Sequence, residues 1–279
     1  MDFTKFKCVF SDLDKTLLAT GSVLSDYTKE TIELLTSRGI DFIPSSGRAF
    51  NSLPKDLFSV KGLKYCVTSN GVTVNSMTDG TPLSTMCVPP ELVDAIHSFV
   101  KGMDIAIEYF TGGQGYGNRD YYRHPEKYKG YLPEKMPYYL ATRKPLDDVE
   151  KFVAENKEKI EALDILAAPE IIKDLMPKLK AEFPQVYMTN SEDYLIEISN
   201  ADSGKHRGME RCCDILGIQP EQCIAFGDAA NDMEMLSKAG LGIAVANASQ
   251  ECKAAADFVS IFTNDQDSVA REIRKIFSL

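Results

Sequence analysis

Two pairs of aspartates, far apart in the chain, have the residue type and the placement of a metal site. Asp12 and Asp14 follow one apolar run, and Asp228 and Asp232 follow another near the carboxyl end. Carboxylates within a few ångströms of one another repel by roughly 4 kcal/mol per pair at an effective dielectric near 20, so they remain ionised together only around a cation or a shared proton. An all-oxygen site suits a hard divalent cation such as Mg²⁺. These four residues therefore predict a magnesium site.

The residues before these acids predict the strands that position them. Residues 8–11 and 223–227 are apolar runs of strand length, and a helix-like pattern follows the second pair of aspartates. In an open α/β sheet, ligands bind in the crevice beyond the carboxyl ends of the strands. We therefore expect both pairs of acids to face one crevice.

Strand-like and helix-like segments alternate at both ends of the chain. At the amino end, a helix is predicted at 26–38, closed by Gly39, and strands are predicted at 40–45 and 63–69. At the carboxyl end, the predicted elements are helices at 205–216, 231–238 and 268–277, and strands at 195–199, 223–228, 242–246 and 258–261. This alternation predicts an α/β fold in which helices cover parallel strands.

Four motifs in sequence order resemble those of the haloacid dehalogenase superfamily, most closely its Cof-type sugar-phosphatase branch. The motifs are the DxDxT of Asp12 to Thr16, the segment Ser45-Ser46-Gly47-Arg48, Lys205, and the GDxxND that ends at Asp232. Asn70-Gly71 and Asn247-Ala248 also resemble that branch. The resemblance covers residues 6–75 and 194–265. One departure is Lys15, which stands where the family commonly has glycine.

The resemblance implies a Rossmann-like parallel-sheet core at 1–82 and 191–279, with an inserted α+β cap of the larger, type-two kind at 83–190 that sets substrate specificity. The middle of the chain has elements enough for such a domain. They are helices from Pro90, at 146–159 and from Pro169, strands at 104–110, 163–168 and 186–189, and a loop rich in glycine and tyrosine at 111–131. We expect this cap to close over the crevice of the core.

The resemblance also implies catalytic roles. Asp12 would be the nucleophile that forms an aspartyl-phosphate, and Asp14 would protonate the leaving oxygen and later deprotonate water. Mg²⁺ would be held by the Asp12 side chain, the backbone carbonyl of Asp14 and the Asp228 side chain. Asp232 would be a direct ligand or lie next to one. An acid at a helix start is also favoured by the helix dipole, so a structural role for Asp232 stays open.

Phosphate contacts are predicted at several other positions. Ser46 offers a hydroxyl and an amide at a strand end, and Lys205 offers a charge where a helix opens, which is a natural anion site. Together with these two, the predicted substrate and phosphate contacts are Gly47, Arg48, Asn70, Asn231 and Asn247. For Arg48, Asn70 and Asn247, a turn or surface role is an equally good interpretation.

Composition narrows the class of protein. A net charge of −10 and a pI near 4.9 argue against a nucleic-acid partner, which would need a basic patch. The sequence has no run of 18 apolar residues and no signal-peptide pattern at its amino end, so we expect a cytoplasmic protein without a membrane partner. Seven scattered cysteines without a CxxC pair predict reduced thiols rather than disulfides or a zinc site.

Three functions are compatible with these residues. The first is a Mg²⁺-dependent phosphatase of small phosphorylated metabolites, with sugar phosphates as the favoured substrates. The second is a phosphomannomutase-like phosphomutase on the same scaffold, which would retain a bisphosphate intermediate. The third is a catalytically silent binding protein, against which the presence of Asp12, Asp14 and Lys205 argues. The sequence indicates neither the individual substrate nor the oligomeric state.

Overall fold

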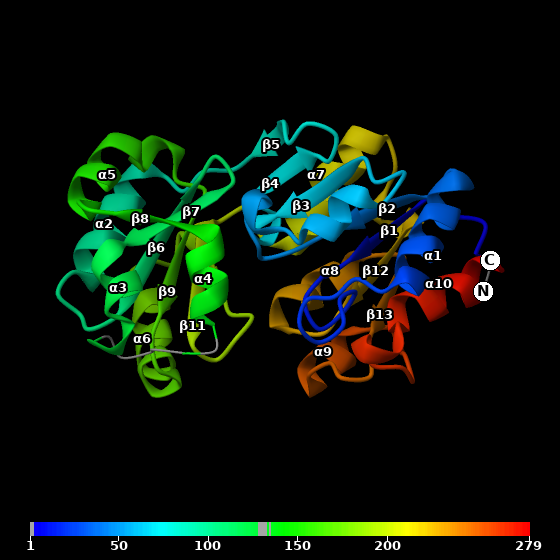
Figure 1. The fold of residues 1–279 in the computed structure, drawn as a ribbon. Coiled ribbons are helices and arrows are strands. Elements are labelled where there is room, and N and C mark those ends of the chain that lie inside the picture. Colours follow the sequence, from blue (N-terminus) through cyan, green and yellow to red (C-terminus); the bar gives the residue numbers. More distant parts are fainter. Residues whose placement is uncertain (1–2, 128–132, 134) are drawn as a thin grey trace. The chain divides into compact units, whose positions relative to one another are not determined.

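The computed structural model describes residues 3–127, 133 and 135–279, and the chain divides into two compact units (Figure 1). The core unit comprises Met1–Arg48, Leu53–Ser84 and Gly204–Leu279. The inserted unit comprises Ala49–Ser52 and Thr85–Ser203. Each unit has its own sheet and its own buried apolar cluster, so each is described by itself.

A five-stranded parallel sheet forms the centre of the core unit, in the order β14-β13-β12-β1-β2. Its strands are β1 (Cys8–Ser11), β2 (Asp41–Pro44), β12 (Cys223–Gly227), β13 (Leu241–Ala244) and β14 (Phe258–Val259). Ser11 is in register with Phe226, so the carboxyl ends of β1 and β12 lie side by side. The two acid pairs follow these two ends, as the sequence predicted.

Helices cover the parallel sheet, and their ends have identifiable causes. They are α1 (Asp26–Ser37), α7 (Lys205–Leu216), α8 (Met233–Lys238), α9 (Gln250–Ala255) and α10 (Ser268–Phe277). The Ser25 hydroxyl accepts a hydrogen bond from the Thr28 amide and caps the start of α1. Gly217 ends α7 in the left-handed conformation that glycine adopts without a steric cost. Helices α7, α8 and α9 share one apolar cluster with β1, β12 and β13.

A smaller sheet continues the core unit beyond β2. It contains β3 (Tyr65–Thr68), β4 (Thr73–Ser76) and β5 (Pro82–Thr85), and β3 pairs antiparallel with β4. A single bridge between Ser45 and Val67 links it to the end of β2. In the part of the chain that the structure describes, the 3-10 turns are Phe50–Ser52, Lys55–Ser59, Ser69–Gly71, Pro125–Lys127, Lys157–Lys159, Pro220–Gln222, Ala230–Asp232 and Asn264–Gln266.

The inserted unit is built on a six-stranded mixed sheet in the order β10-β11-β9-β6-β7-β8. Its strands are β6 (Ala106–Thr111), β7 (Gln114–Asn118), β8 (Arg143–Leu146), β9 (Ala162–Leu166), β10 (Val186–Thr189) and β11 (Leu195–Asn200). All neighbours pair antiparallel except β7 and β8, which are parallel. Its helices are α2 (Pro90–Val100), α3 (Arg119–Arg123), α4 (Met136–Thr142), α5 (Val149–Asn156) and α6 (Pro169–Glu182).

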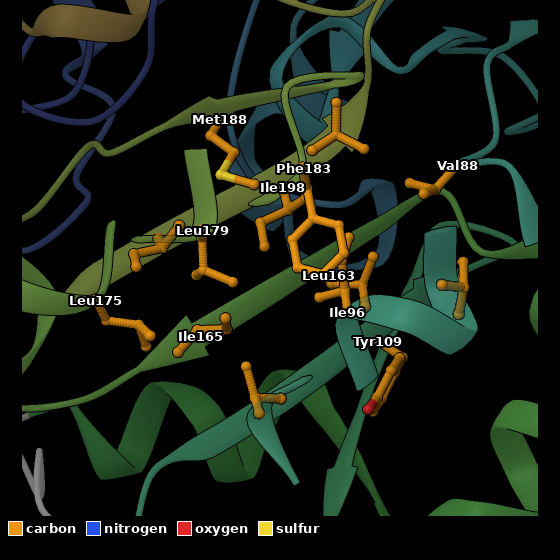
Figure 2. Close-up of a cluster of buried hydrophobic side chains, with 14 of the residues drawn as sticks. Val88, Ile96, Tyr109, Leu163, Ile165, Leu175, Leu179, Phe183, Met188 and Ile198 are labelled. Carbon is orange, nitrogen blue, oxygen red and sulfur yellow. The ribbon is translucent and has the colours of Figure 1, made fainter. Parts of the chain in front are cut away.

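Alternation along these strands gives the inserted sheet two different faces. On one face, Tyr109, Leu163, Ile165 and Ile198 pack into a large apolar cluster with residues of α2, α5 and α6 (Figure 2). On the other face, a smaller cluster joins β6 and β9 to the tyrosines of α3 and α4. Successive strand residues point to opposite faces of the sheet. The acidic residues that alternate along these strands with residues of the large cluster therefore face α3 and α4.

The predicted α/β fold, with a parallel-sheet core and a second α+β part, is confirmed, and some finer expectations differ. The predicted boundary at 190–191 falls before β11, which pairs with β9 and β10, so contacts group residues up to Ser203 with the inserted unit. The predicted loop at 111–131 contains β7 and α3, and its residues 128–131 lie outside the described part. The seven cysteines form no disulfide in this structure. None of the helices described combines the length and the apolar composition that a membrane span requires.

Candidate active site

Three buried aspartates meet beyond the carboxyl ends of β1 and β12. Asp12, Asp228 and Asp232 each offer one carboxylate oxygen, and these oxygens lie within 4.8 Å of one another. The Asp12 amide donates to the Phe226 carbonyl at 3.0 Å, which extends the β1–β12 pairing and fixes the direction of the Asp12 side chain. The predicted convergence of the two acid pairs is therefore present for three of the four residues.

Lys205 is the cation inside this group. It is the first residue of α7 and is 1% exposed, and its ammonium donates to Asp12 Oδ1 and to Asp232 Oδ1, each at 2.6 Å. The second oxygen of Asp232 accepts the backbone amides of Asp228 at 3.0 Å and Ala229 at 3.1 Å. Asp232 thus holds both the lysine and the turn after β12.

Two neighbours fix the Asp228 turn. The Thr16 hydroxyl donates to Asp228 Oδ1 at 2.8 Å and ties the turn after β1 to the turn after β12. A Cβ on Gly227 would lie 2.4 Å from the Cβ of Asp232, so only glycine allows this close approach.

Burial and like charges shift the titration of the group. Burial raises the pKa of Asp12 well above its usual value, although Lys205 acts in the opposite direction. Burial also raises the pKa of Asp228 to about 6, and the charge of Asp232 adds to the shift. Burial opposes the charge of Lys205, but Asp12 and Asp232 outweigh it and raise its pKa above the usual value. The site is therefore short of positive charge.

This shortage fits a divalent cation. Three carboxylates beside one ammonium leave two negative charges uncompensated when all are ionised. The donor set contains only oxygen, which is the set that Mg²⁺ prefers. Asp12 and Asp228 are the better candidates for direct ligands, because both Asp232 oxygens already accept hydrogen bonds.

The Asp14 side chain lies apart from this group. Its two oxygens accept a forked pair of hydrogen bonds from Arg48, from Nε at 2.7 Å and from Nη2 at 2.5 Å. Nη2 also donates to the Ser22 hydroxyl at 2.8 Å. The predicted metal contact of Asp14 is through its backbone carbonyl, so this side-chain geometry does not oppose it.

Ser46, Asn70 and Asn231 form a second connected group near the site. The Ser46 hydroxyl accepts the Arg48 amide at 3.1 Å, and the Ser46 carbonyl accepts the Asn70 amide at 3.0 Å. Asn231 donates through Nδ2 to Asn70 Oδ1 at 2.9 Å, and both amides are buried. Gly47 links Ser46 to Arg48. The structure thus brings together the second predicted motif and the asparagines.

The Asn247 side chain hydrogen-bonds to two loops near the site. Its side chain donates to the Lys15 carbonyl at 2.7 Å and accepts the Asn264 amide at 2.9 Å. Lys15 has φ of 62°, the left-handed conformation that favours the glycine common in the family. Asn247 therefore supports this turn through its side-chain amide, and its predicted contact with phosphate stays a prediction.

Sequence reasoning missed three residues of this arrangement. Thr16 belongs to the first motif, and its position opposite a strand-end aspartate was the available signal. Ser22 lies in an irregular segment and carried no signal. Gly71 packs closely against Gly204: a Cβ on Gly71 would lie 2.0 Å from the Gly204 carbonyl oxygen, and only the folded chain shows this contact.

Comparison with known proteins assigns the chain to a family. The family model for haloacid dehalogenase-like hydrolases matches residues 9–273. The 5-amino-6-(5-phospho-D-ribitylamino)uracil phosphatase of Bacillus subtilis is 28% identical over 291 residues, which cover 98% of each chain.

Two solved structures have the same fold. A haloacid dehalogenase-like hydrolase from Bacteroides thetaiotaomicron has a TM-score of 0.81 at 22% identity and covers 98% of this chain and 100% of its own. A subclass IIB sugar phosphatase of the superfamily has a TM-score of 0.79 at 19% identity, covering 98% of this chain and 99% of its own. Because the family match spans almost all of the sequence, the chain belongs to the haloacid dehalogenase-like hydrolases, as its resemblance to the Cof-type branch predicted.

Proposed function

We propose that this phosphatase hydrolyses small phosphorylated metabolites, with sugar phosphates as the favoured class, through an aspartyl-phosphate on Asp12. The observation that carries the proposal is the buried group at the ends of β1 and β12, where Asp12 lies beside Asp228 and contacts Lys205 at 2.6 Å. A carboxylate nucleophile, a neighbouring cation and a metal-binding set of oxygens are what phosphoryl transfer requires.

The chemistry divides into two steps. In the first, an Asp12 oxygen attacks phosphorus, the bond from phosphorus to the leaving oxygen breaks, and Asp14 supplies the proton that this oxygen takes up. In the second, a water oxygen attacks phosphorus, the acyl-phosphate bond breaks to restore the Asp12 carboxylate, and Asp14 receives the proton of the water. General acid and base catalysis of this kind contributes about 10²- to 10⁴-fold.

The other residues hold the reacting groups. Lys205 orients Asp12 and places a positive charge where phosphate oxygens carry negative charge. Mg²⁺ would be held by Asp12, Asp228 and the backbone carbonyl of Asp14, and when bound it would neutralise charge on the phosphate. Asp232 positions Lys205 and the Asp228 turn. Ser46, Gly47 and Asn231 are the proposed phosphate contacts nearby.

Two lines support the substrate class. The relative from Bacillus subtilis is named for a phosphorylated ribityl compound, and one structure of the same fold is named a sugar phosphatase. The inserted unit contains none of the four motifs, so we propose that it selects among substrates.

A phosphate-release screen tests this function. Sugar phosphates, nucleotides, phosphorylated cofactors and phospho-acids should be incubated with the protein and Mg²⁺, and Asp12→Asn should be the inactive control. We expect phosphate release from a subset of the sugar phosphates. Borohydride reduction during turnover should trap the acyl phosphate at position 12 and convert that aspartate to homoserine. Little phosphate release together with a requirement for a sugar bisphosphate would instead indicate a phosphomutase.

A further inference from the structure

The Asp14 carboxylate is held on both of its oxygens, although it lies near the surface. The Asp14 side chain is 44% exposed, whereas the Arg48 side chain is 14% exposed. Arg48 Nε contacts Asp14 Oδ2 at 2.7 Å and Nη2 contacts Oδ1 at 2.5 Å, which is the forked geometry that fixes both the direction and the plane of a carboxylate.

Ser22 completes the arrangement from a strained position. Its hydroxyl accepts from Arg48 Nη2 at 2.8 Å and donates to Asp14 Oδ1 at 3.4 Å. Ser22 has φ of 60°, a left-handed conformation that costs a side-chain-bearing residue roughly 1–2 kcal/mol. A strained residue that keeps two polar contacts to one carboxylate and its partner points to a positioning task.

The backbone of Arg48 is anchored on the other side. Its amide donates to the Ser46 hydroxyl at 3.1 Å, and its carbonyl accepts the Ser69 amide at 2.9 Å. The guanidinium therefore starts from a fixed point beside β2 and reaches the turn after β1. The Arg48 side chain thus connects Asp14, which belongs to the first motif, to the second motif.

We infer that Arg48 and Ser22 are positioning residues that orient the Asp14 carboxylate for proton transfer to the leaving group. This inference rests on the proposed function, because it needs Asp14 to be the acid and base. It is an alternative to the prediction that Arg48 is a phosphate contact, since Nε and Nη2 donate to Asp14 in this structure. A displacement of about 1 Å in a reacting group can cost on the order of 10²-fold in rate.

The test compares a substrate with a poor leaving group and an activated aryl phosphate. The variants are Arg48→Gln, Arg48→Lys, Ser22→Ala, Ser22→Gly, Asp14→Asn and the double variant Arg48→Gln/Asp14→Asn. Arg48→Gln should lower kcat for the sugar phosphate by about 10- to 100-fold, because misplacement of the acid affects proton transfer. It should leave the first-turnover burst of aryl alcohol release and the inhibition by inorganic phosphate nearly unchanged, because neither depends on proton transfer to the leaving oxygen. Steady-state turnover of the aryl phosphate also contains the second step, in which Asp14 is the base.

The double variant separates positioning from phosphate binding. If Arg48 acts only through Asp14, then Arg48→Gln should cause no further loss when Asp14 is already Asn. Arg48→Lys should resemble Arg48→Gln, since a single ammonium keeps the charge but loses the fork. Ser22→Ala and Ser22→Gly should cause equal, smaller losses of kcat on the sugar phosphate. Equal losses assign the effect to the missing hydroxyl, because only the glycine variant also relieves the backbone.

Arg38→Gln is the matched control, because Arg38 Nη1 donates to a backbone carbonyl on the surface of the same unit. Equal losses in the first step on both substrates, together with weaker phosphate inhibition, would overturn the inference and make Arg48 a phosphate ligand. A rise in kcat would overturn it too, because Arg48 would then hold Asp14 away from the reaction. If Asp14→Asn itself fails to distinguish the two substrates, the acid role in the proposed function fails instead.

Discussion

The core unit holds three buried carboxylates beside one basic side chain, and the inserted unit holds two buried carboxylates and one half-buried carboxylate beside another. Only the core group has the geometry of a metal site. In the core unit, the acids follow adjacent parallel strands or the turn after them, so one oxygen of each lies within 4.8 Å of the others. Lys205 contacts two of the three at 2.6 Å. The group converges on a point.

The acids of the inserted unit form a row instead. Glu108 is in register with Asp164, and Asp164 with Glu197, so the three lie on one face of neighbouring antiparallel strands. Arg143 donates through Nε to Glu108 Oε2 at 2.6 Å, and the Tyr122 hydroxyl donates to Glu108 Oε1 at 2.8 Å. Arg143 and Tyr122, which belong to the same unit, thus hydrogen-bond to the carboxylate of Glu108 at one end of the row.

The difference teaches that a shifted pKa does not identify a metal site by itself. Burial, followed by the charges of Glu197 and Glu108, raises the pKa of Asp164 well above its usual value, much as burial raises that of Asp12. Among the described residues, however, only the core group brings three acidic ligand atoms within reach of one ion. The core group differs from the inserted group in the convergence of its carboxylates at strand ends, more than in the raised pKa values of its acids.

The largest expected difference between the two groups is in turnover. Asp12→Asn should lower kcat by about 10⁴-fold or more, because it removes the nucleophile and conserves volume. Glu108→Gln in the inserted unit should leave aryl phosphate turnover close to that of the unmodified protein. Phosphate release measured at a temperature where both variants are folded, as judged by circular dichroism, checks this pair. Comparable losses in the two variants would break the contrast.

When the basic residue of each acidic group is removed, Mg²⁺ should restore stability in the core group and not in the inserted group. Lys205→Met and Arg143→Met each leave buried carboxylates without their cation, which typically costs about 3–5 kcal/mol of folding free energy. Mg²⁺ should recover much of the loss in Lys205→Met, because it replaces positive charge in the same group. It should recover none in Arg143→Met. Thermal unfolding in excess chelator and in Mg²⁺ gives both comparisons, and equal recovery would contradict the account.

The pH dependence of the metal-free protein should show the same contrast. Because the folded-state pKa of Asp228 is raised from 3.8 to about 6, its contribution to stability is fully present below pH 4 and is lost as the pH rises through 6. Mg²⁺ binds the ionised form, so the rise in Tm caused by Mg²⁺ should grow between pH 4.5 and pH 7. We expect Asp228→Asn to remove most of this growth, and growth that persisted unchanged would argue against Asp228 as a ligand.

The smallest expected effect is in the inserted unit. Tyr122→Phe removes the hydroxyl that donates to Glu108 and should lower the free energy of unfolding by about 1–3 kcal/mol, because a buried charged acceptor loses a donor. Turnover of an aryl phosphate should not change. Tyr27→Phe is the control, since Tyr27 is 37% exposed. Thermal unfolding of the two variants checks this, and a loss of turnover in Tyr122→Phe would place the acidic row in the chemistry.

The core fold could be predicted from the sequence because its signals are local. The bounds of α7 follow from Lys205, the apolar pattern and Gly217, and the structure has the same bounds. The elements β7 and α3 could not be predicted, because Gly115 packs against Arg143, which is distant in sequence. At the site, motif spacing predicted Asp12, Asp228 and Lys205, whereas the contact of Arg48 with Asp14 and Ser22 depends on the folded path of an irregular loop.

The central claim is that the converging aspartates form a Mg²⁺ site that phosphoryl transfer requires. It is tested most directly by phosphate release from an aryl phosphate, measured after exhaustive chelation and again during titration with Mg²⁺ and then Ca²⁺. We predict no turnover in chelator, full recovery with Mg²⁺ and poor recovery with Ca²⁺, because the larger and looser Ca²⁺ shell does not hold the phosphate in line for attack. Full activity in excess chelator would contradict the claim.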